Sequence, residues 1–449
     1  MEISQLIPQF GGTLFTLAAF VVALSIIVAI HEYGHYIVGR WSGIKADVFS
    51  LGFGPVLFKR TDKHGTVWQV AALPLGGYVK FRGDADAASA GTDEAAIEGL
   101  SEDEKRTTMA GAPLWARTAT VAAGPMFNFV LAFVLFSALF LTRGVISEPL
   151  TVGELRPMPS VQELQEGDVL LSIAGQEVPD FSDAEGFAAF AEALPPENDL
   201  DYRILRDGQE LTVTGPYPYP PNVTRLVPRS AAYDVGLAPG DVILSVDGNE
   251  IATFDQIKEA VETSEGRALL LDVWRDGEVL EFALAPRRVD EPGAEGGFVT
   301  YWRVGVVGGL FFEPATSTPG FGQALQGGVR QTWAIMEGSV SGLWHIITGQ
   351  ISSCNLSGPV GIAETSGQMA AQGTSNFLWF VAVLSAAVGL LNLFPIPVLD
   401  GGHLVFYAYE AVVGRPPHDK VLGVLMTIGL GIVLSVMVFS LSNDLILCP

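Results

Sequence analysis

Two histidines and a glutamate form the part of this chain whose residue types and spacing could do chemistry. His31, Glu32 and His35 stand in an apolar run from about residue 11 to residue 38. On a helix, residues four apart project from one face, so both imidazoles can bind one metal ion while Glu32 reaches a water on it. This HExxH spacing predicts zinc-dependent hydrolysis inside a membrane span. The alternative is a pair of hydrogen-bonded interfacial histidines, although ionisable residues in spans usually persist for a function.

A catalytic zinc usually has three protein ligands and one open position, so two histidines are insufficient. The candidates for the third ligand are Asp400 and the remaining histidines, His64, His345, His403 and His418. We favour Asp400, because Pro395 and Pro397 interrupt an apolar stretch just before it, and irregular backbone at membrane depth is tolerated where it lines a cavity. The alternative is an aspartate that only caps a helix.

The elements that must position these residues are membrane spans. A crossing needs about 20 apolar residues. Four stretches qualify, at about residues 13–38, 118–141, 376–398 and 421–441. An even number of spans places both termini on one side. Lys and Arg are frequent between residues 39 and 117 and absent from residues 1–12, which predicts a cytoplasmic first loop, an external segment 142–375 and a metal motif near the cytoplasmic end of its span.

Charge and cysteine content set further limits. The formal net charge of -24 argues against nucleic-acid binding. The sequence contains two cysteines, Cys354 and Cys448, both expected outside, where a disulfide can form. Two independent thiols are the alternative, and the sequence leaves both open.

The external segment contains an internal repeat. Residues 166–178 align with residues 239–251, which indicates two copies of one module. In each copy an Arg-Asp-Gly sequence follows the aligned stretch, at residues 206–208 and 275–277. It predicts hairpin turns between short strands.

The repeated pattern resembles tandem PDZ domains of the bacterial type, most clearly at residues 230–241. The resemblance implies that the second copy binds extended peptide C-termini by strand addition. The first copy departs from the pattern at residues 156–165, which lack the Ala-rich helix and the Gly-Leu pair. A spacer or a gate is the competing interpretation, and we favour a gate for the pair.

The chain as a whole resembles the site-2 protease family of intramembrane zinc proteases, most closely its RseP type. The shared features are HExxH in a first span, Asn-x-x-Pro-x-Pro-x-Leu-Asp-Gly at residues 392–401, and PDZ modules between them. Further matching stretches are residues 49–55, residues 74–80, Gly124-Pro125 with Asn128, and residues 357–363. The resemblance implies a multi-span α-helical membrane protein of about four transmembrane helices, with two periplasmic PDZ-like α+β domains inserted between spans 2 and 3.

The resemblance also implies a role for each site residue. His31, His35 and Asp400 hold Zn²⁺, and Glu32 is the general base. Asn392 assists substrate handling. The strand within residues 74–81 pairs with unwound substrate by edge addition, through Gly76, Gly77, Tyr78 and Val79. The alternative for this strand is a plain structural hairpin.

The implied activity is cleavage of single-span membrane proteins in regulated intramembrane proteolysis. The implied substrates are an anti-sigma factor whose outer domain has already been trimmed, in a stress response, and signal-peptide remnants. The tandem modules then fit a filter against untrimmed substrates. The implied location is the lipid bilayer of the bacterial inner membrane, with both termini and the PDZ-like domains periplasmic and the active site near the cytoplasmic side. The alternatives are a non-catalytic PDZ scaffold with a vestigial metal site, and a metal transporter.

These inferences divide the chain into five parts. The membrane catalytic part comprises residues 1–143, which include a membrane-associated β-hairpin, and residues 376–449. PDZ-like domains 1 and 2 comprise residues 144–220 and 221–310. Residues 311–375 form a periplasmic connector with an amphipathic helix, which suits the membrane interface or, alternatively, packs as an ordinary core helix.

Overall fold

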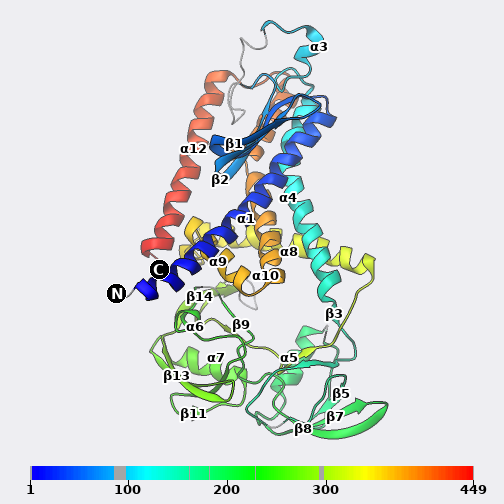
Figure 1. The fold of residues 1–449 in the computed structure, drawn as a ribbon, viewed down its shortest axis with the longest axis vertical. Coiled ribbons are helices and arrows are strands. Elements are labelled where there is room, and N and C mark those ends of the chain that lie inside the picture. The colour runs from blue at the N-terminus through cyan, green and yellow to red at the C-terminus, as the bar shows by residue number, and fades with distance from the viewer. Residues whose placement is uncertain are drawn as a thin grey trace. The chain divides into compact units, whose positions relative to one another are not determined.

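The computed structural model describes residues 3–84, 98–160, 162–181, 183–227, 229–292 and 298–447. The chain divides into two compact units, which are described separately below (Figure 1). Unit 1 comprises Met1–Leu139, Phe321–Trp344 and Ser353–Pro449, and unit 2 comprises Phe140–Gly320 and His345–Ser352.

Four helices of the described chain are long and apolar enough to cross a membrane: α1 (Ile3–Trp41), α4 (Leu114–Arg143), α10 (Thr374–Asn392) and α12 (Asp419–Ser442). This finding confirms the prediction of four spans. Helix α10 ends at Asn392, before the predicted end at residue 398, because Pro395 and Pro397 cannot continue a helix. A short loop follows, and α11 (Asp400–Val413) begins at the aspartate that the sequence singled out.

Glycines allow these helices to pack closely in unit 1. A Cβ atom at Gly34 of α1 would lie 2.6 Å from the carbonyl oxygen of Ala123 on α4. A Cβ at Gly389 of α10 would lie 3.0 Å from the carbonyl oxygen of Pro125, also on α4. Small residues let helix backbones approach one another in membranes. Helix α4 therefore packs directly against both the helix that carries HExxH and the span that leads to Asp400.

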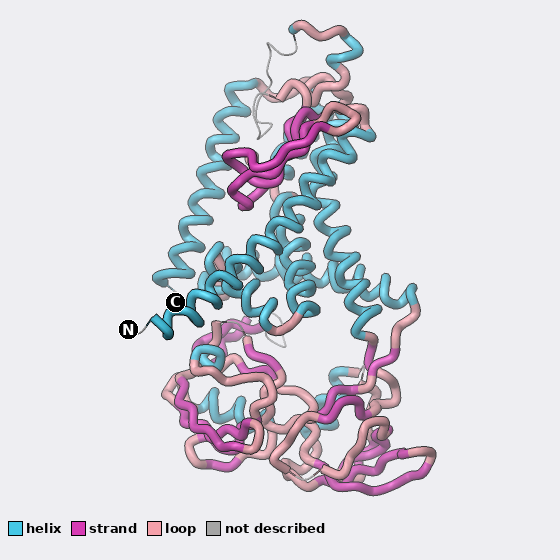
Figure 2. The backbone as a smooth tube through the Cα atoms, in the orientation of Figure 1, coloured by secondary structure: helices cyan, strands magenta, loops and turns pink. Residues whose placement is uncertain are grey.

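A curled β-hairpin packs against α1, as Figure 2 shows by its magenta tube. It consists of β1 (Ala46–Thr61) and β2 (Val67–Phe81). Residues 48–51 pair with residues 77–80 on one side and with residues 67–70 on the other. Residues 77–80 are therefore an edge, and no strand of the described chain pairs with their outer side.

Unit 2 contains two four-stranded sheets with the same topology, in the orders β6-β5-β7-β8 and β11-β10-β12-β13. The first consists of β5 (Val169–Ile173), β6 (Gln176–Glu177), β7 (Leu200–Arg206) and β8 (Gln209–Gly215), with helix α5 (Ala184–Glu192). The second consists of β10 (Val242–Val246), β11 (Asn249–Glu250), β12 (Leu269–Arg275) and β13 (Glu278–Leu284), with helix α7 (Phe254–Thr263). The predicted Arg-Asp-Gly turns are present, with positive φ angles at Asp207-Gly208 and Asp276-Gly277.

The first sheet is completed by a segment that follows the second. Phe311 and Phe312 belong to the core of the first sheet, together with Tyr202. Strand β17 (Phe312–Pro314) pairs with β4 (Val152–Leu155), which precedes the first sheet. The sequence division placed residues 311–375 in a connector, and this part of it is wrong, because residues 311–314 pack in the first module. The other boundaries stay predictions.

The remaining elements of the described chain are as follows. In unit 2 they are β3 (Val145–Ile146), β9 (Arg225–Leu226), α6 (Ala231–Asp234), β14 (Arg287–Pro292), β15 (Phe298–Arg303), β16 (Val306–Val307) and β18 (Thr316–Ser317). The remaining helices are α3 (Glu102–Lys105), α8 (Phe321–Ile347), α9 (Pro359–Ala371), a 3-10 turn (Ser353–Asn355) and a π turn (Asn443–Leu447). Cys354 is disulfide-bonded. Cys448 lies outside the described residues.

Helix α8 contains most of the predicted amphipathic segment. It exposes Trp333 and Trp344, whereas Ala324, Gly328 and Thr332 are buried. The amphipathic character of this segment and its position at a membrane interface stay predictions.

Candidate metal centre

Helix α1 brings His31 and His35 together on consecutive turns. Their Nε2 atoms lie 3.1 Å apart, and their rings meet edge to face with centroids 4.8 Å apart. This is the geometry expected of two side chains four residues apart on one helix. Both rings therefore present a nitrogen to the same point in space.

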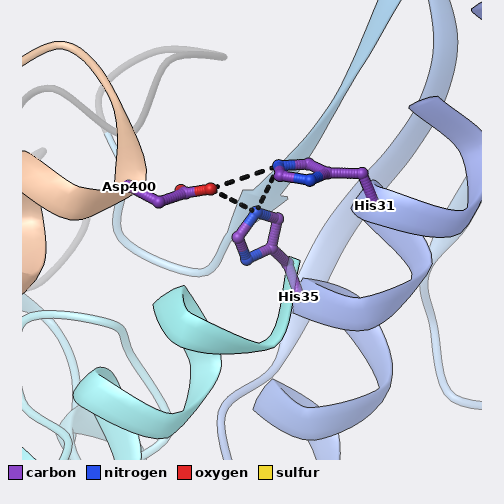
Figure 3. A group of neighbouring side chains, drawn as sticks. All are labelled: His31, His35 and Asp400. Carbon is purple, nitrogen blue, oxygen red and sulfur yellow. Dashed lines mark hydrogen bonds and ion pairs between the residues drawn. The ribbon is translucent and has the colours of Figure 1, made fainter. Parts of the chain in front are cut away.

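Asp400, the first residue of α11, reaches the same point from a distant part of the chain (Figure 3). Its Oδ2 atom lies 3.2 Å from Nε2 of His31 and 3.5 Å from Nε2 of His35. The following glycines permit the tight turn, because a Cβ at Gly401 or Gly402 would overlap carbonyl oxygens of the preceding loop. The structure thus brings together the three residues that the sequence proposed as ligands.

The three ligand atoms fit the size of a zinc ion. Ligands about 2.0 Å from a tetrahedral zinc lie about 3.3 Å from one another, and the observed separations are 3.1, 3.2 and 3.5 Å. Oδ2 of Asp400 is also buried without a hydrogen-bond partner. A buried carboxylate oxygen is costly when it is left in this state, and a cation at this point would satisfy it.

Residues of α4 surround the imidazoles on their other side. Nδ1 of His35 lies 2.9 Å from the carbonyl oxygen of Thr120, and Nδ1 of His31 lies 3.2 Å from Nδ2 of Asn128. A Cβ at Gly124 would overlap Nε2 of His35 and lie 2.9 Å from Cε1 of His31. These three α4 residues are four apart, so they share one helix face. That spacing is the sequence signal that could have identified them as part of the site.

A cavity of about 370 Å³ contains the ligands and Glu32. Gly77 and Val79 of β2 line the same cavity, and a Cβ at Gly77 would lie 3.2 Å from Cγ of Glu32. The outer edge of the hairpin therefore lies directly beside the carboxylate that the sequence proposed as the base. Gln69 donates a hydrogen bond to the Tyr78 hydroxyl at 3.1 Å, which fixes that side chain at the same cavity.

The other predicted residues are distributed as follows. Gly77, Tyr78, Val79 and Asn392 line the cavity, and the Asn392 amide donates a hydrogen bond to the Val388 carbonyl oxygen at 3.1 Å. Gly76 is not among the lining residues; its φ is +152°, and a Cβ there would overlap the Phe53 ring, which explains the glycine. Of the other histidines, His403 lines the cavity, whereas His64, His345 and His418 do not.

Comparison with known proteins gives a consistent result. The model of peptidase family M50 matches residues 19–436. A zinc metalloprotease of Rhizobium meliloti, so named, is 36% identical over 434 residues, which cover 96% of each chain. The protease RseP of Yersinia pestis and the regulator of sigma-E protease RseP of Salmonella typhimurium are 33% and 32% identical, over 96% of this chain and 98% of theirs.

Proposed function

Because the chain belongs to peptidase family M50 and is a membrane-embedded zinc metalloprotease of the RseP type, we propose that it cleaves single-span membrane proteins within the bilayer. The proposed ligands are His31, His35 and Asp400, and the proposed base is Glu32. One observation carries the proposal: three ligand atoms and a glutamate meet in one cavity, and two of the ligands and the glutamate belong to an apolar helix long enough to span a membrane.

The chemistry divides between the metal and Glu32. When bound, zinc lowers the pKa of a coordinated water to about 7 and polarises a carbonyl oxygen. The Glu32 carboxylate accepts the proton that the attacking water releases, and then gives it to the amide nitrogen of the leaving chain.

The edge of β2 is the proposed substrate template. A peptide bond in a transmembrane helix is hydrogen-bonded and shielded, so a substrate must be extended before water can attack it. Residues 77–80 offer an unpaired strand edge beside Glu32, and an extended substrate can pair with that edge. Gly77 lets the strand approach, because a Cβ there would lie 3.2 Å from Cγ of Glu32. Asn392 lines the same cavity and is proposed to hydrogen-bond the substrate backbone.

The two modules of unit 2 are proposed to be PDZ-like domains inserted between the second and third spans. Their shared strand order supports this assignment. The second module contains a groove of about 480 Å³, lined by apolar side chains such as Ile257 and Val261 and by basic ones such as Arg229 and Lys258. Its proposed ligand is a peptide C-terminus, because a free carboxylate suits the basic side chains and a terminal apolar side chain suits the rest.

The proposed setting is the bacterial inner membrane, with the termini and the modules in the periplasm and the active site near the cytoplasmic side. The basic first loop supports this orientation. The proposed substrates are an anti-sigma factor that has lost its outer domain, in regulated intramembrane proteolysis, and signal-peptide remnants. As a filter, unit 2 would reject a substrate that keeps its folded outer domain. A variant without residues 145–317 should cleave both forms, and continued rejection would contradict the filter.

The decisive experiment is cleavage of a single-span substrate by the purified protein and its Glu32→Gln variant, with zinc measured in both. We expect the variant to keep one zinc ion per chain and to lose at least about 10³-fold in kcat, because the proton acceptor is lost and the ligands remain. Glu337→Gln, the same change at an exposed residue of α8, is the control and should leave both quantities unchanged. Retained cleavage in Glu32→Gln would remove Glu32 from the mechanism.

A further inference from the structure

Asn128 is a buried polar residue of α4 that the proposed mechanism does not use. It is 0% exposed, and its side-chain amide faces His31, with Nδ2 at 3.2 Å from Nδ1. The other end of the same amide, Oδ1, is buried without a hydrogen-bond partner. A buried amide with one end unsatisfied is unfavourable, so its orientation needs an explanation.

The metal site imposes a requirement on His31. The Nε2 atoms of both histidines point to Asp400 Oδ2, so both would bind an ion through Nε2. A neutral imidazole that binds through Nε2 carries its hydrogen on Nδ1, and that N–H needs an acceptor. His35 has one, because Nδ1 lies 2.9 Å from the carbonyl oxygen of Thr120. For His31, the neighbour of Nδ1 is the Asn128 amide.

Rotation of this amide by 180° satisfies Oδ1 of Asn128 and also provides the acceptor that Nδ1–H of His31 needs. It exchanges Oδ1 and Nδ2, so that Oδ1 accepts the hydrogen of His31 Nδ1 and is no longer unsatisfied.

The backbone of Asn128 is fixed, so the change is confined to the amide. The Ser385 hydroxyl on α10 donates a hydrogen bond to the Asn128 carbonyl oxygen at 2.9 Å. A Cβ at Gly389 would lie 3.1 Å from Cβ of Asn128. Helix α10 thus contacts both the backbone and the Cβ atom of Asn128.

We propose that Asn128 is a positioning residue that selects the zinc-binding tautomer of His31, by directing its amide oxygen toward the hydrogen on Nδ1. The proposal rests on the proposed zinc site. A main-chain carbonyl performs the same task for His35, so the two ligands are oriented by different means. A side-chain substitution can therefore remove the acceptor for His31 but not the acceptor for His35.

The test is zinc affinity, measured by competition with a chelator, in the full-length protein. Asn128→Leu keeps the shape of the side chain and removes the acceptor, and we expect zinc to bind 10–100-fold more weakly. Asn128→Asp keeps an acceptor and should bind zinc within about threefold of the parent. Ser385→Ala is the matched control: it removes a hydrogen bond to the same residue without altering its amide, and should leave affinity unchanged.

The outcomes separate this inference from the zinc site itself. If Asn128→Leu binds zinc like the parent while Asp400→Asn does not, the inference is wrong and the site stands. Equal weakening by Asn128→Leu, Asn128→Asp and Ser385→Ala would indicate a packing role and also overturn the inference. If Asp400→Asn keeps its zinc, the proposed site is wrong. Should the leucine variant not accumulate, Asn128→Ala is the second acceptor-free variant, with the same expected loss relative to Asn128→Asp.

Discussion

The modules of unit 2 and the metal centre of unit 1 both bury carboxylates, but they pair them in opposite ways. In unit 2, the Asp168 and Asp241 side chains are each 1% exposed, and each accepts two hydrogen bonds from one arginine, Arg206 or Arg275. In unit 1, Oδ2 of Asp400 is buried without a hydrogen-bond partner, between two imidazole nitrogens. The first arrangement satisfies the charge within the module, whereas the second leaves it available to an ion.

The two arrangements also differ in their relation to the sequence repeat. Each Arg–Asp pair joins the end of one strand to the turn before another, and both modules contain it at equivalent positions. Bidentate pairs of this kind fix geometry as well as adding energy. The Asp400 arrangement has no equivalent in unit 2 among the described residues. A repeated, fully paired carboxylate therefore indicates structure, and a single, incompletely paired one indicates chemistry.

The largest effect is expected from Asp400→Asn. The substitution removes the only anionic ligand, so we expect zinc to be lost and kcat/KM to fall by at least about 10³-fold. Hydrogen exchange in unit 2 should not change. Zinc analysis, turnover and exchange by mass spectrometry measure these effects. Full zinc occupancy in the variant would break the comparison, because Asp400 would then be a structural carboxylate like those of unit 2.

The second-largest effect is expected from Asp241→Asn, which should reduce the stability of the second module and leave the metal centre unchanged. Removal of one partner from a buried ion pair costs about 3 kcal/mol, so the second module should open more readily. Hydrogen exchange should increase in β10, β12 and β13, while zinc content and cleavage of a trimmed substrate stay unchanged. Asp168→Asn is the matched variant and should act on β5, β7 and β8 instead. A loss of zinc in either variant would contradict the separation of the two roles.

The third effect concerns a residue that shapes the site without a functional group. In Gly124→Ala, the added Cβ would overlap Nε2 of His35, so the imidazole must move. A displacement of about 1 Å from productive geometry costs about 10²-fold in rate, and we expect a loss of that size in kcat/KM. Gly431→Ala, with no atom within 4 Å of the added Cβ, is the control. Unchanged turnover in Gly124→Ala would mean that the histidines need no exact placement.

The sequence predicted one side of the site better than the other. His31, Glu32 and His35 could be found because helix geometry converts a spacing of four into a shared face. Asp400 could be found because prolines beside a carboxylate are unusual in an apolar stretch. Thr120, Gly124 and Asn128 have no comparable chemical signature, because they act through a main-chain carbonyl, a missing side chain and an amide, and only their shared spacing of four relates them to one helix face.

Unit 2 shows a similar limit. The repeat predicted both sheets and their turns, because each hairpin is encoded locally. It could not show that Phe311 and Phe312, which follow the second module, complete the core of the first. That pairing depends on contacts between residues more than 150 positions apart, such as Phe312 with Leu155. The apolar run at residues 310–312 was the available signal, and it does not specify a partner.

The smallest effect is expected at Asp62. It tests whether a fully hydrogen-bonded carboxylate in unit 1 is structural, as the carboxylates of unit 2 are. Asp62 lies in unit 1, in the hairpin turn, and accepts hydrogen bonds from Tyr36, Trp68 and the backbone N–H groups of His64 and Thr66. Burial raises its pKa, but these hydrogen bonds outweigh that effect and lower the pKa to about 2. Asp62 is thus a fully paired carboxylate of the kind found in unit 2, and it should act as a structural group.

A lowered folded-state pKa gives stability that is present above the unfolded pKa of about 3.9 and is lost as the pH falls toward 2. After discounting for solvent, we expect about 1 kcal/mol of local stability in the turn above pH 4. Hydrogen exchange of residues 62–66, corrected for intrinsic rates, should therefore show protection that declines between about pH 4 and pH 2. In Asp62→Asn the decline should vanish while zinc content stays unchanged. If this variant instead loses zinc, the completeness of its hydrogen bonding does not distinguish a structural carboxylate from a catalytic one.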